Sequence, residues 1–135
     1  KFEAGTPNIA GCIAFGAAID YINSIGLDKI NSYENHLLQY ATEKLNGIKN
    51  VKIYGESASK TSVISFNVNG IHPYDLGSIL DKMGIAVRTG QHCAQPIMDF
   101  FKITGTLRIS FAFYNTEKEI DFLIETLRKA IKILS

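Results

Sequence analysis

Apolar residues recur every three or four positions through the first 47 residues, and this spacing predicts two successive helices. The first is expected to begin at Thr6 and Pro7, because threonine caps helices and proline fits their first position. Gly26 is expected to end it, Asp28 to cap the second helix, and Gly47 to end that one. The predicted apolar faces are Cys12, Phe15, Ile19 and Ile22 in the first helix, and Ile30, Tyr33, Leu37, Ala41 and Leu45 in the second.

The hydrophobic period changes after residue 50, where short alternating runs predict strands. Strands are expected at 51–55, 61–68, 85–87 and 106–113. Helices are expected at 72–84, as one or two turns at 96–101, and from Thr116 onward, where Thr116 and Glu119 form a capping box. The apolar positions expected in the core are Ile64, Phe66, Val68, Leu76, Ile79, Leu80, Met83, Leu107, Ile109, Phe111, Phe113, Ile120, Leu123, Ile124, Leu127, Ile131 and Leu134.

This order of elements predicts an α+β fold with a small, mostly antiparallel sheet covered by helices on one face. The other face of the sheet would carry Arg108, which alternates with the apolar residues of its strand and is unsuited to a core. The sequence shows no internal repeat and no low-complexity linker.

Composition narrows the function classes. The chain has 135 residues, 46% hydrophobic content and a formal charge of +1, which gives no electrostatic argument for nucleic acid or an anionic membrane. Two cysteines far apart in the sequence form neither a disulfide framework nor a zinc-binding spacing, and they favour a reduced, cytoplasmic setting. The opening KFEAGTPN lacks a methionine and leads directly into a helix, so we expect a piece of a longer protein.

The segment RTGQHCAQP, residues 88–96, contains the candidate nucleophile Cys93. A free cysteine most often packs as a small hydrophobe, but no apolar periodicity includes Cys93, whereas Cys12 lies on a helical stripe and is expected in the core. Arg88 and His92 supply positive charge that favours the thiolate. A cysteine–histidine dyad of adjacent residues and a zinc site are both disfavoured by spacing and ligand number. Cys93 is therefore either a core residue or a reactive thiol.

Two further features suggest anion binding. Arg108 is one of only three arginines among fourteen basic residues, and in mid-strand it is either a solvent-exposed side chain or a bidentate clamp for a carboxylate or phosphate. Arg88 at a strand end has the same two interpretations. The segment EAGTPN offers backbone N–H groups and a hydroxyl at a helix start, which is either a simple cap or an anion site.

Together these segments resemble those of the SUF-type (group II) cysteine desulfurases and selenocysteine lyases of the class V aminotransferases. RTGQHCAQP is similar to the segment around the catalytic cysteine of that family, and FEAGTPN to its R-F-E-x-G-T-P segment. LRISFAFYNTEKEIDFLIETLRKAI is similar to its C-terminal segment. The resemblance covers essentially the whole chain. It implies the C-terminal part of a homodimeric, fold type I, pyridoxal 5'-phosphate enzyme, with the end of the large domain at 1–26 and the small domain at 27–135.

The resemblance also implies residue roles. Cys93 would attack the sulfur of L-cysteine and carry it as a persulfide, leaving L-alanine, for iron–sulfur cluster assembly. Arg108 would hold the substrate carboxylate, while Arg88 and His92 would shape the pocket around the thiol. Gly5 and Thr6 would contact the phosphate of the cofactor in the partner subunit. The sulfur would pass to an acceptor protein of the SUF system.

Several family features are absent from the sequence. No lysine stands in the Ser-x-His-Lys context of the cofactor lysine, and Gln91 replaces a frequent histidine. The 135 residues alone are therefore expected to be inactive and to bind pyridoxal phosphate poorly. Alternatives are selenocysteine lyase activity, a class V aminotransferase without thiol chemistry, and a non-catalytic α+β module for binding or dimerisation.

Overall fold

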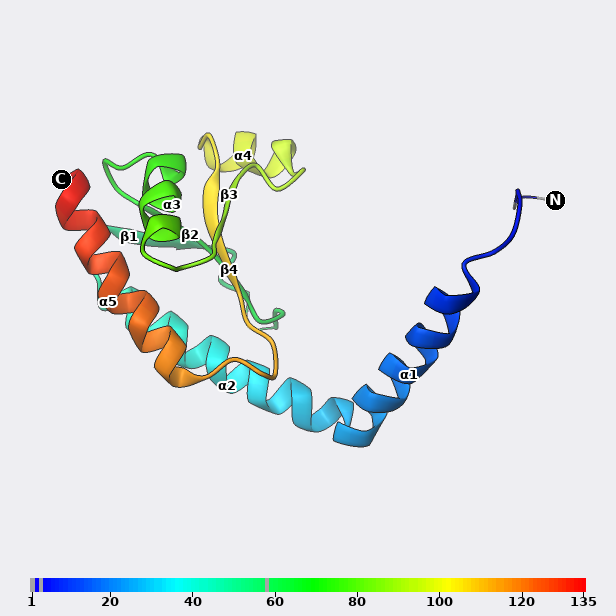
Figure 1. The fold of residues 1–135 in the computed structure, drawn as a ribbon. Coiled ribbons are helices and arrows are strands. Elements are labelled where there is room, and N and C mark those ends of the chain that lie inside the picture. Colours follow the sequence, from blue (N-terminus) through cyan, green and yellow to red (C-terminus); the bar gives the residue numbers. More distant parts are fainter. Residues whose placement is uncertain (1, 3, 58) are drawn as a thin grey trace.

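The computed structural model describes residues 2, 4–57 and 59–135 (Figure 1). Its helices are α1 (Ile9–Ile25), α2 (Leu27–Asn46), α3 (Pro73–Lys82), α4 (Gln95–Phe101) and α5 (Glu117–Leu134). Its strands are β1 (Val51–Tyr54), β2 (Val63–Val68), β3 (Arg88–Gly90) and β4 (Thr106–Ser110). The strands form one sheet in the order β1-β2-β4-β3, and every neighbouring pair is antiparallel. The predicted α+β class and antiparallel sheet are confirmed.

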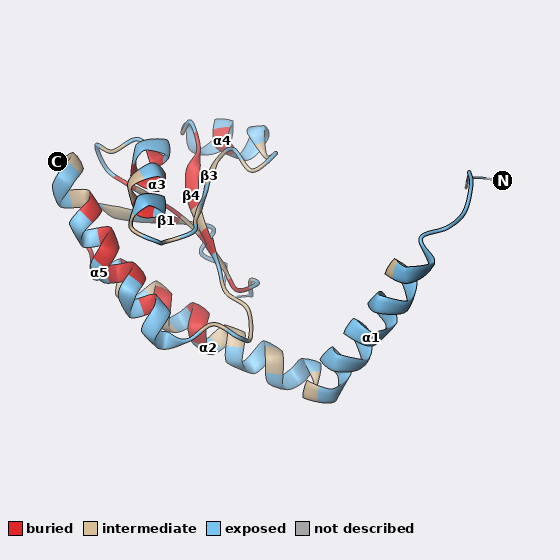
Figure 2. Ribbon diagram, in the orientation of Figure 1, coloured by how far each residue is buried: buried red, intermediate tan, exposed pale blue. Residues whose placement is uncertain are grey.

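The hydrophobic core lies between one face of the sheet and the helices α2, α3 and α5. Alternation along β2 buries Ile64, Phe66 and Val68, as the sequence predicts for one face of a strand. Leu107 and Ile109 of β4 continue the same face. Figure 2 shows the buried residues concentrated in the sheet and the helices around it. The short helix α4 departs from the prediction, because it packs near the opposite face, where Phe101 contacts the ring of Tyr54 at 5.2 Å between centroids.

The prediction for α1 is wrong in its start and in its environment. Asn8, not Thr6, caps the helix: its side chain accepts a hydrogen bond from the Gly11 N–H at 2.9 Å, and asparagine is the stronger cap. The helix contains no buried residue, and Cys12 is exposed rather than in a core. Figure 1 shows why: α1 extends away from the sheet, and among the ring contacts of the described residues only that of Tyr21 with Phe113, at 6.3 Å between centroids, joins α1 to the rest of the chain.

Three other boundaries differ from the predicted ones. Gly26 serves as N-cap of α2 as well as C-cap of α1. Asp28 therefore lies in the first turn of α2, where its negative charge interacts favourably with the positive end of the helix dipole. Residues 85–87 form no strand, because the Ile85 N–H closes α3 by bonding to the Leu80 carbonyl. Strand β4 stops at Ser110, since the Ala112 N–H turns to the Asn115 side chain.

By length and hydropathy, no single helix in the described part of the chain could span a membrane, and only α1 and α2 taken together, bent by 75°, pass the same test.

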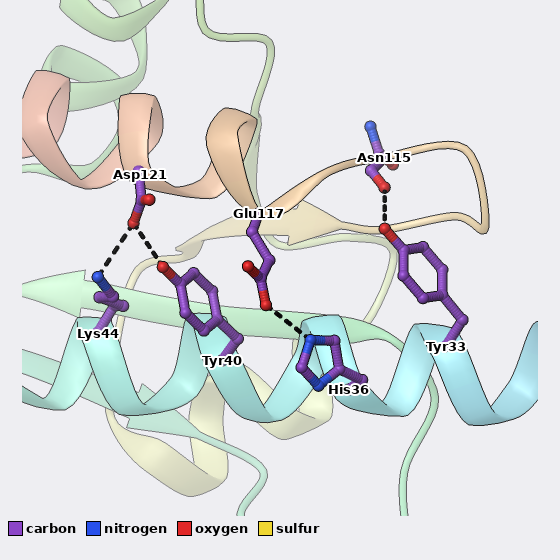
Figure 3. A network of polar contacts seen from close by, with 7 residues as sticks. All are labelled: Tyr33, His36, Tyr40, Lys44, Asn115, Glu117 and Asp121. Atoms are coloured by element: carbon purple, nitrogen blue, oxygen red, sulfur yellow. Dashed lines mark hydrogen bonds and ion pairs between the residues drawn. The ribbon is translucent and has the colours of Figure 1, made fainter.

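A line of polar contacts joins α2 to the start of α5 (Figure 3). His36 pairs with Glu117 at 2.7 Å, and Asp121 accepts from Tyr40 at 2.9 Å and pairs with Lys44 at 3.1 Å. These hydrogen bonds hold the pKa of the Asp121 carboxyl below its ordinary value. Exposed pairs of this kind contribute little to stability, so the buried helix faces and not these contacts hold the two helices together.

Replacing Thr116 with alanine should destabilise the fold by about 1 kcal/mol, because it removes the cap of α5. The Thr116 hydroxyl accepts from the Glu119 N–H, and the Glu119 carboxylate accepts from the Thr116 N–H at 2.7 Å, which completes the predicted capping box. Urea unfolding measures the change, with Thr116→Ser as the control that keeps the hydroxyl. Equal stability of the alanine and serine variants would show that the cap is dispensable.

Candidate functional site

Cys93 lies in a turn between β3 and α4, and its thiol is exposed. Strand β3 ends at Gly90, whose φ of 114° is a backbone conformation that only glycine adopts without strain. His92 and Cys93 then both adopt φ of 56°, a left-handed conformation that costs roughly 1–2 kcal/mol per residue. The Ala94 N–H closes the turn on the Gln91 carbonyl at 3.0 Å. The alternative of Cys93 as a core residue is wrong; the turn holds a thiol in solvent.

A row of polar residues crosses the sheet on the face opposite the core. The strand register pairs Tyr54 with Ser65, Ser65 with Arg108, and Arg108 with Arg88. Like charges directly opposite each other destabilise a sheet. Neither arginine has an acidic partner among the described residues. An anion bound between the two guanidinium groups would relieve this repulsion, so the row is suited to a carboxylate or phosphate ligand.

A cavity of about 230 Å³ opens between this row and α4. It is lined mainly by apolar side chains, with Arg108 and His92 among the few polar ones. Arg108 and His92 each contain a polar side-chain atom, Nε and Nδ1 respectively, that is buried and has no hydrogen-bond partner in the described part of the chain. A buried donor and a buried acceptor that lack partners each carry a desolvation cost. A guanidinium group among the lining of a mainly apolar cavity is suited to a small ligand that carries an anionic group.

Thr106, the first residue of β4, holds the ring of His92 through hydrogen bonds. The Nε2 of His92 lies 3.0 Å from the hydroxyl and 3.2 Å from the carbonyl oxygen of Thr106, a residue only 1% exposed. Burial lowers the pKa of His92 below its ordinary value, and the charge of Arg108 and, more weakly, Arg88 acts in the same direction. The hydrogen bond to the Thr106 carbonyl opposes these effects. The imidazole is therefore neutral at neutral pH.

Acidification should destabilise the folded chain through His92. Because its folded pKa lies below the unfolded value of about 6.5, the unfolded state binds more protons in that window. The stability is present above about pH 6.5 and is lost as pH falls through the folded pKa. Between about pH 7.5 and pH 5.5 the unfolding temperature should drop more in the unchanged chain than in His92→Asn. An equal drop in both would contradict this assignment.

Among the predicted site residues, the structure pairs Arg88 with Arg108 and places His92 in the lining of one cavity with Arg108, while Cys93 directly follows His92 in the turn after β3. Gly5 and Thr6 are not part of this group: they are exposed in the segment before α1, which extends away from the sheet (Figure 1). The sequence analysis missed Ser65 and Thr106. Both occupy alternate positions of their strands that point to the face opposite the core, so the alternation along each strand could have identified them.

No group of three or more histidine, cysteine, aspartate or glutamate side chains within the described ranges could hold a metal ion. No lysine lines the cavity either, as far as the structure describes the chain. The chemistry available in this region is that of an exposed thiol in the turn after β3, two guanidinium groups paired across β3 and β4, and an imidazole whose pKa is lowered.

Comparison with known proteins identifies the family of this chain. The aminotransferase class-V family matches residues 1–123. Curated relatives include a cysteine desulfurase of Wigglesworthia glossinidia brevipalpis, 50% identical over 99% of this chain and 32% of its own length. Another is a cysteine desulfurase of Serratia proteamaculans, 48% identical over 99% of this chain and 33% of its own length. The chain thus spans about a third of the length of the curated relatives it matches.

Solved structures show that the fold itself is shared. The apo structure of a cysteine desulfurase from Thermococcus onnurineus NA1 superposes with a TM-score of 0.91 at 43% identity, covering 97% of this chain and 33% of that one. The S-sulfonic acid form of the Escherichia coli cysteine desulfurase CsdA superposes with a TM-score of 0.91 at 34% identity, covering 98% and 33%.

Proposed function

This chain belongs to the aminotransferase class-V family, and we propose that it is the C-terminal part of a pyridoxal-phosphate-dependent cysteine desulfurase. The observation that carries the proposal is the exposed Cys93 thiol, held in a left-handed turn that follows β3, the strand in which Arg88 pairs with Arg108 of β4. Relatives named cysteine desulfurases, at 48–50% identity over nearly the whole chain, support it. In this proposal residues 1–26 end the large domain and residues 27–135 form the small domain.

The residues of the site have complementary tasks in the proposed reaction. Arg108 holds the carboxylate of L-cysteine, because it lines the cavity and has no acidic partner among the described residues. Arg88 adds charge at the same row of the sheet. The Cys93 thiolate attacks the sulfur of the substrate; an Sγ–S bond forms and the substrate Cβ–S bond breaks. The electron pair of that bond stays on carbon, which takes up a proton and yields L-alanine, while Cys93 retains the persulfide.

Pyridoxal phosphate, when bound, supplies the electron withdrawal that lets the carbon–sulfur bond break. The described residues fit only part of its site. Gly5 and Thr6 offer exposed backbone N–H groups and a hydroxyl, which suit the phosphate of a cofactor held by a second subunit. Because no lysine lines the cavity in the described part of the chain, the lysine that binds the cofactor would come from outside these residues.

The 135 residues alone should therefore neither bind pyridoxal phosphate tightly nor turn over L-cysteine. Titrating the isolated chain with the cofactor and recording absorbance measures this directly. A new absorbance band at stoichiometric cofactor would contradict the expectation.

The wider setting follows the same proposal. The full-length protein acts as a cytoplasmic homodimer and passes its persulfide sulfur to an acceptor protein of the SUF system, for iron–sulfur cluster assembly. The exposure of Cys93 supports transfer to a second protein, because a buried persulfide could not be reached by an acceptor thiol.

The decisive experiment gives L-cysteine to the full-length protein loaded with its cofactor. One L-alanine should form for each sulfur transferred to a thiol acceptor, and mass spectrometry should find one added sulfur on the peptide that contains Cys93. L-selenocysteine serves as the competing substrate, and turnover of selenocysteine alone would identify a lyase. Absence of turnover with both substrates would favour a non-catalytic module, and alanine without persulfide would contradict the thiol mechanism.

A further inference from the structure

The tripeptide Asn-Gly-Ile occurs twice in the sequence, at residues 46–48 and at residues 69–71. An asparagine followed by glycine is open to attack on its side-chain amide by the next backbone nitrogen, because glycine has no Cβ to hinder the approach. Both asparagines and both glycines are exposed to solvent. The two sites therefore share their local chemistry and their access to water, and they differ in the backbone structure around them.

The first pair, Asn46 and Gly47, is held at the end of α2. Asn46 is the last residue of that helix, and the N–H of Gly47 donates to the Glu43 carbonyl at 3.2 Å. The N–H of Ile48 donates to the Leu45 carbonyl at 3.0 Å, and both of these side chains are buried. Closing a ring on the side chain of Asn46 would rotate its helical backbone and break the hydrogen bond of Gly47.

The second pair, Asn69 and Gly70, forms the centre of a turn between β2 and α3. The Ile71 N–H closes the turn on the Val68 carbonyl at 3.1 Å, and the Asn69 N–H donates to the Asn50 carbonyl at 2.8 Å. Both hydrogen bonds belong to the peptide groups on either side of the Asn69–Gly70 bond. Within the described residues, the N–H of Gly70 and the carbonyl of Asn69 form no hydrogen bond.

This central peptide group can rotate without loss of a hydrogen bond. Gly70 has a φ of 84°, and glycine also adopts negative φ at little cost. The two commonest turn types differ mainly by rotation of the central peptide group, while the bond that closes the turn is retained. Such rotation carries the backbone nitrogen of Gly70 toward the side-chain carbonyl carbon of Asn69.

We propose that Asn69 is a site of spontaneous deamidation in the folded protein, and that Asn46 is protected by its place in α2. The Gly70 nitrogen attacks Cγ of Asn69: an N–Cγ bond forms, the Cγ–Nδ2 bond breaks, and Nδ2 leaves as ammonia with the proton of the Gly70 N–H. Water then opens the cyclic imide at either of its carbonyl groups and gives aspartate or isoaspartate. The reaction needs no oxidant or reductant, and it does not depend on the proposed desulfurase function.

The modification changes both the charge and the backbone of this turn. Either product replaces a neutral amide with a carboxylate, which lowers the formal charge of the 135 residues from +1 to 0. Isoaspartate also carries the main chain through its Cβ, so it lengthens the turn that the Ile71–Val68 hydrogen bond closes. The next residue, His72, caps α3, so the change lies at the junction between the sheet and that helix.

Incubating the full-length protein at neutral pH and following both Asn-Gly-Ile peptides by mass spectrometry tests the proposal. Amide loss should be about tenfold faster at Asn69 than at Asn46, which corresponds to about 1.4 kcal/mol. In concentrated urea the two rates should become equal, because the two tripeptides are identical. Equal rates in the folded protein, faster loss at Asn46, or a tenfold difference that persists in urea would each overturn the proposal.

The products and two substitutions test the chemistry of the step. Ring closure by Gly70 should give isoaspartate beside aspartate at residue 69, which electron-transfer fragmentation distinguishes; aspartate alone would exclude this route. Asn69→Gln keeps an amide but requires a larger ring, so it should abolish the fast amide loss. Asn46→Gln is the matched control and should leave the loss at Asn69 unchanged. Fast amide loss that continues elsewhere in Asn69→Gln would contradict the assignment to Asn69.

Discussion

Replacing Cys93 with alanine in the full-length protein should abolish persulfide formation and lower L-alanine production by more than about a thousandfold. The expected effect is large because Cys93 supplies the atom that receives the sulfur, and the described part of the chain holds no second thiol near the cavity. The exposed left-handed turn presents this one sulfur atom to substrate and acceptor alike.

Cys12 provides the matched control. It is the only other cysteine in the sequence, and it too is exposed, but it lies on α1, away from the sheet (Figure 1). Cys12→Ala should leave both persulfide and L-alanine formation unchanged. Mass spectrometry of the protein after a single addition of L-cysteine reads out both variants. Persulfide formation that persists in Cys93→Ala would show that the nucleophile lies elsewhere.

Replacing Arg108 with lysine should raise KM for L-cysteine on the order of a hundredfold, because lysine cannot reproduce the two parallel hydrogen bonds of a guanidinium to a carboxylate, and disrupting a hydrogen-bonded charge pair costs about 2–5 kcal/mol. Lysine keeps the charge but not the planar fork of donors. Steady-state kinetics of L-cysteine desulfuration measures the change, and the effect should fall mainly on KM.

Arg128 is the control for this substitution, since it is an exposed arginine on α5 and lies outside the cavity around Arg108. Arg128→Lys should leave KM unchanged. Arg88→Lys should have a smaller effect than Arg108→Lys, because Arg88 is exposed whereas Arg108 is partly buried. A KM for Arg108→Lys equal to that of the unchanged enzyme would place the substrate carboxylate elsewhere.

Periodicity predicted the elements whose apolar faces are buried within this chain. The capping box at Thr116, the alternation in β2 and the stripe of α5 are local patterns, and the structure confirms each of them. The same reasoning failed for α1, because an apolar stripe indicates that a face is suited to burial and not what covers it. The misplaced core residue Cys12 follows directly from that failure.

The sequence by itself determined the candidate chemistry: a cysteine without apolar periodicity, flanked by positive charge, and an arginine on the non-core side of a strand. Only the tertiary structure decided how these residues act together. The register that sets Arg88 opposite Arg108, and the contact of His92 with Thr106, join residues up to twenty positions apart along the chain. Such pairings depend on how strands align and turns close, and these long-range constraints leave no periodic signal in a single sequence.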